Sequence, residues 1–459
     1  MTKDMTEGNP LKLILQFAIP LLAGNLLQQG YNLADAAIVG RFLGTKALAS
    51  VGSSSSVQFL VLGFCIGACC GFCVPVAQKF GAKDYSMMRS FIYNSIWLSS
   101  GVAAVMTIAC SLLCTQITKI LATPADIFHN SYIYLLILFL GIPFTMLYNM
   151  TAGVMRAIGD SRTPFIFLAF STVSNIFLDI FCITVLHWGV AGAAIATVAA
   201  QGMSGFLCLF YMIKKYPVLR MDKEERAIRG QLQKTLMLMV FPMGLQFSIT
   251  AIGSMVMQAA NNNLGSIYVS AFTAASRLKM FAMCPFDALA TAVSTFCSQN
   301  YGARKADRIK KGLFQGTAIG VVYGVAVGLI LIFFGTELSS IFVSGKETEV
   351  LAASGRLLYC AGFLFWTLGI LNVVRLCTQG LGYSGRAVFS GVVEMIARTV
   401  VSLGFVPIWG FNAICFADQT AWVTAVLYIV PTCIYCVKKI EKEFGRTMDK
   451  KIMANSSKT

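Results

Sequence analysis

Eight ionisable side chains stand inside long apolar stretches of this sequence, where a charge is costly. They are Asp35, Asp179, Arg277, Lys279, Asp287, Glu394, Arg398 and Asp418. Ionisable groups in such surroundings are rare, and those that occur are candidates for binding an ion, a proton or a substrate. These eight side chains are therefore the first candidates for a functional site.

Asp35 and Asp179 carry the same charge and lie at a similar depth. At 1.5 Å per helical residue, Asp35 lies roughly 9 Å and Asp179 about 10 Å from the near ends of their apolar stretches. Thr197 lies about 12 Å and Asn175 about 17 Å from the same side. Two carboxylates that meet in a low dielectric would share a proton or hold a cation. The alternative is that the acids cap or kink helices, or pair with other buried groups.

The stretches that carry these groups are predicted to be membrane-spanning helices. Of the 459 residues, 57% are hydrophobic and 12% are charged, about half the charged share of a soluble protein. A bilayer-crossing helix needs about 20 largely apolar residues. Twelve stretches qualify: 13–40, 53–77, 91–115, 130–155, 164–186, 190–213, 235–260, 268–298, 313–336, 352–377, 387–408 and 411–437. We expect the first to be a retained span, because it lacks the cleavage site of a signal peptide.

The basic residues indicate the orientation of these spans. Twelve spans put both termini on one side, and that side collects 28 of the 36 Lys and Arg residues, against 5 on the other. The count includes a charged linker, 214–234, and a basic tail, 438–459. Basic loops face the cytoplasm, so we predict cytoplasmic termini in an inner or plasma membrane. The net charge of +16 then reflects membrane topology, and we expect no nucleic-acid partner.

The residues that usually carry enzyme chemistry are sparse. There are two histidines and 15 cysteines, and most cysteines lie in apolar runs as small core residues. The sequence has no HExxH, Walker A or GxSxG pattern. We predict a protein that is not an enzyme and has no cofactor.

The two halves of the chain repeat each other at an offset of 221–223 residues. Gln78–Lys83 matches Gln299–Arg304, and Trp188-Gly189 matches Trp409-Gly410. Each half has six spans, so the copies share one orientation and form a parallel repeat. We predict an all-α polytopic membrane protein with two six-helix lobes around a central cleft, made up of 1–213, the linker 214–234, 235–437 and the tail 438–459.

Several short motifs, taken in order, resemble the multidrug and toxic compound extrusion (MATE) transporters, and most closely their prokaryotic DinF-like branch. They are Asp35-x4-Gly40-Arg41-x2-Gly44, Gly153-Val-Met-Arg156-Ala-Ile-Gly159-Asp160, Asn175-x3-Asp179, Gln299-Asn300-x-Gly302-Ala303 and Glu394-x3-Arg398. The resemblance runs from about Pro10 to Lys438. It implies export of organic, often cationic, compounds in exchange for inward H⁺ or Na⁺. It also implies cation or proton binding at Asp35, Asn175, Asp179 and Thr197.

The carboxylate pair has no counterpart in the second half. The repeat places Met257 at the position of Asp35 and Ser402 at that of Asp179. The second-half polar candidates are Glu394, Arg398, Asp418, Arg277 and Asp287. Glu394 and Arg398 stand four residues apart, which favours an intrahelical ion pair and leaves a substrate or gating role open. Arg277, Lys279 and Asp287 line the cleft or pair with one another.

Pro20 and its counterpart Pro242 kink their spans. The kink at Pro20 is either a hinge for the Asp35 site or static.

The function that we predict is efflux by alternating access, with a small organic substrate, a lipid bilayer around a monomer, and H⁺ or Na⁺ as the coupling ion. A lipid-linked oligosaccharide flippase is the nearest alternative, but it would need several Arg or Lys residues in its cleft. A membrane-embedded transferase would need a His or metal constellation, and none is visible.

Overall fold

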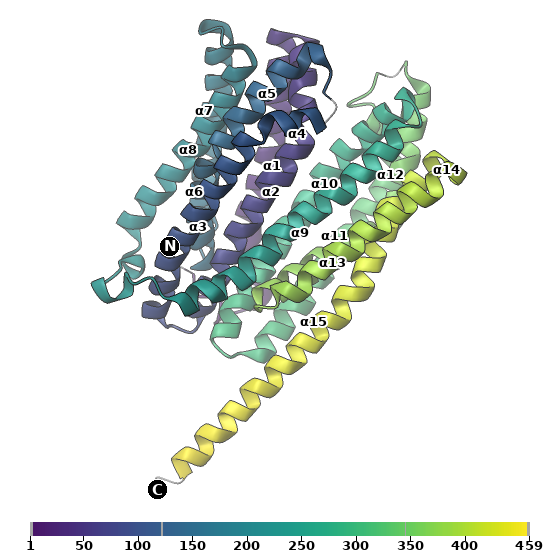
Figure 1. Cartoon of the computed structure of the whole chain (residues 1–459). Helices are drawn as coiled ribbons and strands as arrows, with labels where there is room; N and C mark the ends of the chain where they lie inside the picture. Colours follow the sequence, from purple (N-terminus) through teal and green to yellow (C-terminus); the bar gives the residue numbers. More distant parts are fainter. Residues whose placement is uncertain (1–2, 121–122, 345, 457–459) are drawn as a thin grey trace. The chain divides into compact units, whose positions relative to one another are not determined.

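Helices are the only regular secondary structure in the computed structural model over the residues that it describes, which are 3–120, 123–344 and 346–456. Figure 1 shows the helices in sequence order. The first half comprises α1 (Pro10–Leu43), α2 (Thr45–Gly81), α3 (Tyr85–Leu112), α4 (Cys114–Ile120), α5 (Ala125–Leu140), α6 (Ile142–Ala157), α7 (Arg162–Ile180), the π-helical η1 (Phe181–Val185) and α8 (Gly189–Lys215). The linker holds two short 3₁₀ turns, η2 (Pro217–Leu219) and η3 (Lys223–Glu225).

The second half comprises α9 (Gly230–Asn262), α10 (Ser266–Gly302), α11 (Ala306–Ser339), α12 (Thr348–Gly380), α13 (Ser384–Thr399), the π-helical η4 (Val400–Phe405), α14 (Val406–Trp409) and α15 (Phe411–Ser456). Within the described residues, 11 helices or helix runs are long and apolar enough to cross a membrane. The α5–α6 pair, bent by 44°, makes a twelfth. The predicted all-α polytopic class is therefore confirmed. The predicted tail is helical as far as Ser456, and its last three residues lie outside the described part.

The backbone repeats as the sequence does. Unusual positive φ angles recur in pairs at the same offset: Lys83 (58°) with Arg304 (56°), Gly159 (89°) with Gly382 (91°), and Gly189 (58°) with Gly410 (57°). The two π-helical segments, η1 and η4, also occupy corresponding places. Left-handed backbone is costly for a residue with a side chain, so its recurrence at Lys83 and Arg304 marks a shared turn geometry. The internal repeat is thus present in local structure.

The chain forms two compact units whose limits differ from those of the repeat. Unit 1 comprises residues 1–3, 19–76 and 85–252, and unit 2 comprises 4–18, 77–84 and 253–459. The helices α1 and α9 each belong to both units, because α1 enters unit 1 at Ile19 and α9 leaves it after Ile252. The boundary between the two lobes that the sequence predicts at 214–234 follows the internal repeat, and it stays a prediction.

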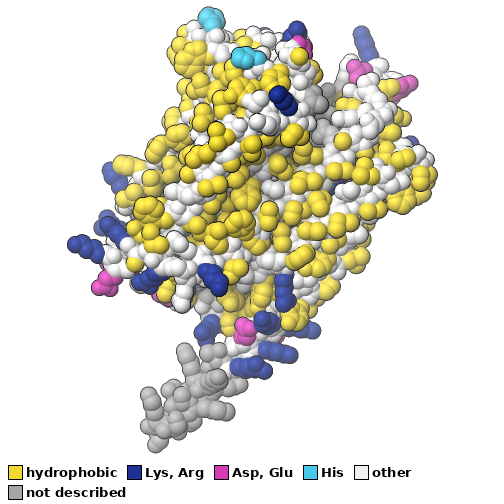
Figure 2. Space-filling view, in the orientation of Figure 1, with side chains coloured by type: hydrophobic (Ala, Val, Ile, Leu, Met, Phe, Trp, Pro, Cys, Tyr) yellow, Lys and Arg dark blue, Asp and Glu magenta, His cyan; other side chains and the backbone are white. Residues whose placement is uncertain are grey.

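The surface of unit 1 carries an apolar belt. In Figure 2 most of its visible Lys and Arg side chains lie at the end opposite the two histidines, and the surface between is mainly hydrophobic. Large exposed side chains such as Phe170, Phe177 and Phe206 contribute to this apolar surface. A soluble monomer rarely exposes apolar patches of this extent, so the belt is the part that meets lipid.

In unit 2 the Gln299–Ala303 motif anchors the start of the chain. The amide of Met5 donates to Gln299 Oε1 at 2.8 Å, and Asn300 Nδ2 donates to the Met5 carbonyl at 3.1 Å. Arg308 donates to the same carbonyl at 3.0 Å. The Met5 side chain is fully buried. This motif therefore has a structural role in holding residues 4–8.

A stripe of glycines lets α11 and α12 pack closely in unit 2. Gly320 and Gly328 on α11 face Gly369 and Gly362 on α12. A Cβ atom built at Gly328 would lie 2.4 Å from the Gly362 carbonyl oxygen. Small residues at such positions allow the backbone contact that holds membrane helices together.

We expect Gly328→Ala to lower the free energy of unfolding by about 1–3 kcal/mol, because the added methyl must push the two helices apart. Thermal unfolding of purified protein in detergent measures the change. The control is Gly101→Ala in α3, where an added Cβ meets nothing within 4 Å and alanine favours the helix. Equal melting temperatures for the two variants would contradict the close-packing argument.

The linker is anchored to α3 in unit 1. Arg89 makes two hydrogen bonds to the carboxylate of Glu225, both 2.6 Å long, and Asn94 Nδ2 donates to the Ala227 carbonyl at 3.0 Å. The hydrogen bonds from Arg89 lower the pKa of Glu225 to about 2, against the opposing effect of burial. In the same unit, Tyr216 donates a hydrogen bond to Asp160. The linker is therefore held against α3 by these hydrogen bonds.

Glu225→Gln should expose the linker to trypsin at neutral pH, with cleavage after Arg226 faster by about tenfold, because a buried charged pair is lost. The control is Glu224→Gln, since Glu224 is an exposed residue of the same turn.

The lowered pKa of Glu225 also predicts a pH dependence of the linker's anchoring. The hydrogen bonds from Arg89 to the Glu225 carboxylate should be fully present above pH 4.5, the ordinary pKa of the group, and should be lost as the pH falls toward about 2. The rate at which pepsin cleaves the linker measures this loss. Cleavage of the linker at equal rates at pH 4.5 and 2 would contradict this.

Candidate functional site

Asp35 and Asp179 meet in the interior of unit 1. Asp35 on α1 is 8% exposed and Asp179 on α7 is fully buried. Their carboxyl groups lie within hydrogen-bonding reach of each other. Asp35 Oδ1 and both Asp179 oxygens receive no hydrogen bond from a donor of the described residues. The structure thus brings together the two acids that the sequence singled out.

Asn175 and Thr197 extend this polar site. Asn175 stands one helical turn before Asp179 and is 1% exposed, and neither atom of its amide has a partner among the described residues. Thr197 on α8 shares a 2.9 Å hydrogen bond with the hydroxyl of Tyr31, one turn before Asp35 on α1. The Tyr31 hydroxyl interacts electrostatically with both acids. Helices α1, α7 and α8 therefore contribute to one cluster of oxygen atoms.

The arrangement is rich in acceptors and poor in donors. Two adjacent carboxylates in a low dielectric repel each other, so one proton or one cation between them lowers the energy. Carboxylate, amide and hydroxyl oxygens suit a hard cation, and a shared proton needs only the two acids. Within the described residues, no group of three or more His, Cys, Asp and Glu side chains could hold a metal. The geometry therefore suits H⁺ or a weakly held monovalent cation.

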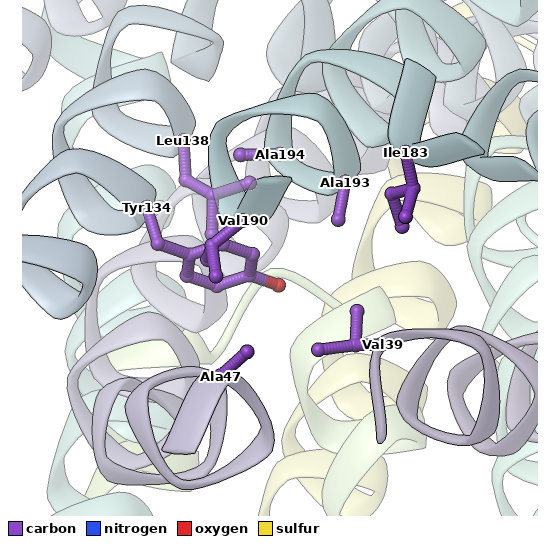
Figure 3. Close-up of a cluster of buried hydrophobic side chains, with 8 residues drawn as sticks. All are labelled: Val39, Ala47, Tyr134, Leu138, Ile183, Val190, Ala193 and Ala194. Carbon is purple, nitrogen blue, oxygen red and sulfur yellow. The ribbon is translucent and has the colours of Figure 1, made fainter. Parts of the chain in front are cut away.

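A layer of buried apolar side chains closes one side of the site. Val39 follows Asp35 by one turn, Ile183 follows Asp179 by one turn, and Ala193 precedes Thr197 by one turn. These three pack with Tyr134, Leu138 and other residues of one hydrophobic cluster. Figure 3 shows the Tyr134 ring in its middle, with the hydroxyl on the side of Val39 and Ala193. The layer excludes water from the polar groups on that side, which strengthens their electrostatic interaction.

The second-half candidates form a buried ionic network in unit 2. Glu394 pairs with Arg398 on its own helix at 2.8 Å, as the four-residue spacing predicts. The network continues in both directions, through Arg375 to Glu394 at 2.6 Å and through Arg398 to Asp418 at 2.9 Å. Lys279 pairs with Asp418 at 2.5 Å. Each acid thus lies between two cations, which makes burial of these charges tolerable.

Two features of the second half were not predicted from the sequence. Arg375 is 6% exposed within α12, because that helix runs on to Gly380. Arg277, Lys279 and Asp287 do not pair with one another, so that alternative is wrong, and their lining of the cleft stays a prediction. Lys279 pairs with Asp418, and Asp287 Oδ1 accepts a 3.4 Å hydrogen bond from Asn372. Arg277 makes no ion pair with any residue that the structure describes. Spacing along α10 could not reveal these partners, since they lie on other helices.

Pro20 lies inside α1, directly after the chain passes into unit 1 at Ile19. The hinge role of Pro20 for the Asp35 site stays a prediction. The segment that follows Asp179 is the π-helical η1. Such insertions are frequent at functional sites.

Two tyrosines near the acids were not predicted from the sequence. Tyr31 lies one turn from Asp35, so the i, i+4 spacing could have indicated it. Tyr134 on α5 interacts electrostatically with both acids, and no sequence signal links it to them.

The comparisons with known proteins agree with this architecture. A family model described as MatE matches residues 20–181 and 242–403, one copy in each half. The chain belongs to the MatE family. It is 31% identical over 384 residues to the probable multidrug resistance protein YpnP of Bacillus subtilis, covering 83% of this chain and 84% of that one.

Two further matches extend this result. The chain is 28% identical over 405 residues to the probable multidrug resistance protein YoeA of the same species, with 86% of each covered. A crystal structure of MATE in complex with MaL6 superposes with a TM-score of 0.89 at 19% identity, covering 96% of this chain and all of that one. The chain is therefore a multi-pass membrane protein of a transporter family.

Proposed function

We propose that this MatE-family protein exports organic compounds in exchange for inward H⁺ or Na⁺. The observation that carries the proposal is the interaction of Asp35 with Asp179 at a buried site that is poor in donors. Such a pair binds one positive charge and changes its surroundings when that charge leaves. The relatives named as multidrug resistance proteins support organic drugs as the substrate class.

The coupling ion enters from the outside in this scheme. Binding at Asp35 and Asp179 biases the two lobes toward one state of the central cleft, and release to the cytoplasm resets them. Each positive charge that moves inward gains about 2.3 kcal/mol per 100 mV. The excess of basic residues on the side of the termini supports cytoplasmic termini in the plasma membrane. We also propose that the protein works as a monomer, is not an enzyme, and binds neither nucleic acid nor a cofactor.

The flippase alternative is disfavoured by the ionic network. Recognition of a pyrophosphate would require several unpaired cations within the membrane. Lys279, Arg375 and Arg398 are paired with carboxylates. Of the basic candidates in the second half, Arg277 has no such partner among the described residues.

Ethidium transport in proteoliposomes tests the proposal. An imposed pH or Na⁺ gradient, with the ion high on the outer side of the protein, should drive ethidium against its own gradient. Imposing one gradient at a time identifies the ion. Absence of a response to both gradients would overturn the proposed exchange.

A further inference from the structure

A groove opens on the surface of unit 2 between the first turns of α11 and the middle of α15. Its volume is about 270 Å³. It is lined from α11 by Lys310, Leu313 and Phe314, and from α15 by Ile434, Val437, Lys438 and Glu441. Both sets follow steps of three and four residues, so each lies on one face of its helix. Two facing helix surfaces therefore form the groove.

The lining of the groove changes from apolar to basic along its length. Leu313 begins one of the predicted membrane stretches and Val437 ends another, and Lys310 and Lys438 lie just beyond these ends. In the apolar part the Phe314 side chain is 76% exposed. An exposed ring in a membrane stretch meets lipid tails, whereas lysines just beyond it reach the headgroups. A ligand that fits both parts has an apolar tail and a polar head.

The basic part of the groove carries more positive than negative charge. Lys310 pairs with Glu441 at 2.5 Å, which joins α11 to α15. Lys438 forms no ion pair with any residue that the structure describes. Lys311 and Lys442 are exposed beside the lining residues in the sequence and add to the charge. Figure 2 shows basic side chains gathered at this end of unit 2. The head of the ligand is therefore expected to be anionic.

The position of α15 is fixed at the basic part of the groove. Phe444 on α15 packs against Tyr301 on α10, with ring centroids 5.7 Å apart. The Lys310–Glu441 pair holds α15 to α11 as well. A site whose helices are already held in place loses less conformational freedom when a ligand binds.

The next residue of α15 belongs to a different surface. Lys439 lies 5.9 Å from the centre of the Tyr383 ring and 3.9 Å from the Glu443 carboxylate, and it does not line the groove. Lys438 and Lys439 thus carry the same charge on adjacent residues of one helix, and only Lys438 lies in the groove. Lys439 is therefore a matched control for Lys438.

We propose that this groove binds one anionic phospholipid, with an acyl chain over Phe314 and Ile434 and the phosphate at Lys438. Basic pockets between membrane helices on the cytoplasmic side bind anionic headgroups, and this basic end is the side predicted to be cytoplasmic. A free phosphate would leave the apolar part of the groove unused. The positive group of a zwitterionic lipid would be repelled by the unpaired lysine. The inference does not depend on the proposed exchange.

Binding of matched ligands to the purified full chain, measured by native mass spectrometry, tests the inference. Dioleoyl phosphatidylglycerol is anionic, dioleoyl phosphatidylcholine has the same acyl chains without net charge, and glycerol 3-phosphate is a free phosphate. We expect phosphatidylglycerol to bind most tightly. Lys438→Gln should weaken its binding about fivefold, the effect of one lysine near a lipid surface, and Lys438→Arg should keep it. Lys439→Gln, the control, should leave it unchanged.

A second variant tests the apolar part of the groove. Ile434 is 49% exposed, so Ile434→Trp should fold normally while it fills the space for the acyl chain. We expect this variant to weaken phosphatidylglycerol binding severalfold, since part of the buried apolar area is lost. Unchanged binding would overturn the placement of the acyl chain in the groove.

The remaining outcomes separate one lipid site from general attraction to basic residues. Unchanged phosphatidylglycerol binding in Lys438→Gln overturns the inference, as does an equal loss in Lys439→Gln. Equal affinity for phosphatidylcholine also overturns it, because the lysines would then select nothing. Binding of glycerol 3-phosphate as tight as that of phosphatidylglycerol overturns the lipid as ligand and indicates a site for a soluble phosphate.

Discussion

Asp35→Asn should abolish the response of efflux to an imposed ion gradient. With asparagine at position 35, Asp179 no longer faces a second carboxylate, so the repulsion that favours a shared proton or cation is lost. Coupling energies between two sites are typically about 1–3 kcal/mol, so the gradient-driven part of ethidium transport should fall roughly tenfold or more. The measurement is initial transport rate in proteoliposomes with and without the gradient.

The controls for this prediction are an unrelated acid and a double variant. Asp126→Asn removes an exposed acid of α5 that lies 3.9 Å from Lys46, and coupling should be unaffected. Asp179→Asn should match Asp35→Asn. The double variant should be no worse than either single one, because residues that act as a unit are not additive. If the double variant loses transport by the product of the two single losses, the acids act independently. A normal gradient response in Asp35→Asn would contradict the ion-site hypothesis.

Glu394→Ala should strongly destabilise the protein. The change leaves Arg375 and Arg398 buried without their shared acid. Breaking a buried ion pair by removing one partner costs about 3–5 kcal/mol, because an uncompensated charge stays inside. Thermal unfolding in detergent should show a melting temperature far below that of the unmodified protein, or a failure to fold.

The matched control has the same helical spacing in an exposed place. Lys439 and Glu443 also stand four residues apart and lie 3.9 Å from each other, with about half of each side chain exposed. Exposed pairs of this kind contribute about 0.3–0.5 kcal/mol, so Glu443→Ala should hardly change the melting temperature. Similar shifts for both variants would show that the network does not contribute through burial of charge.

Much of the architecture was predictable because it depends on local composition. The length of apolar runs predicts membrane spans, and all twelve predicted stretches overlap helices. The matching of Gln78–Lys83 with Gln299–Arg304 predicted the repeat, and the backbone shows it at Lys83 and Arg304. The Glu394–Arg398 pair was predictable because residues four apart on a helix are always neighbours.

The remaining contacts were decided by tertiary structure. Asp35 and Asp179 lie on different helices. Their predicted depth puts both at the same level in the membrane, but it does not show that they are neighbours. Arg375 and Lys279 reach the Glu394 and Asp418 network from two other helices. The spans, the repeat and the buried charges could be predicted from the sequence, because they follow from hydrophobicity and helical spacing. Which charges meet was settled only by helix packing, since spacing along one helix carries no information about the face of another.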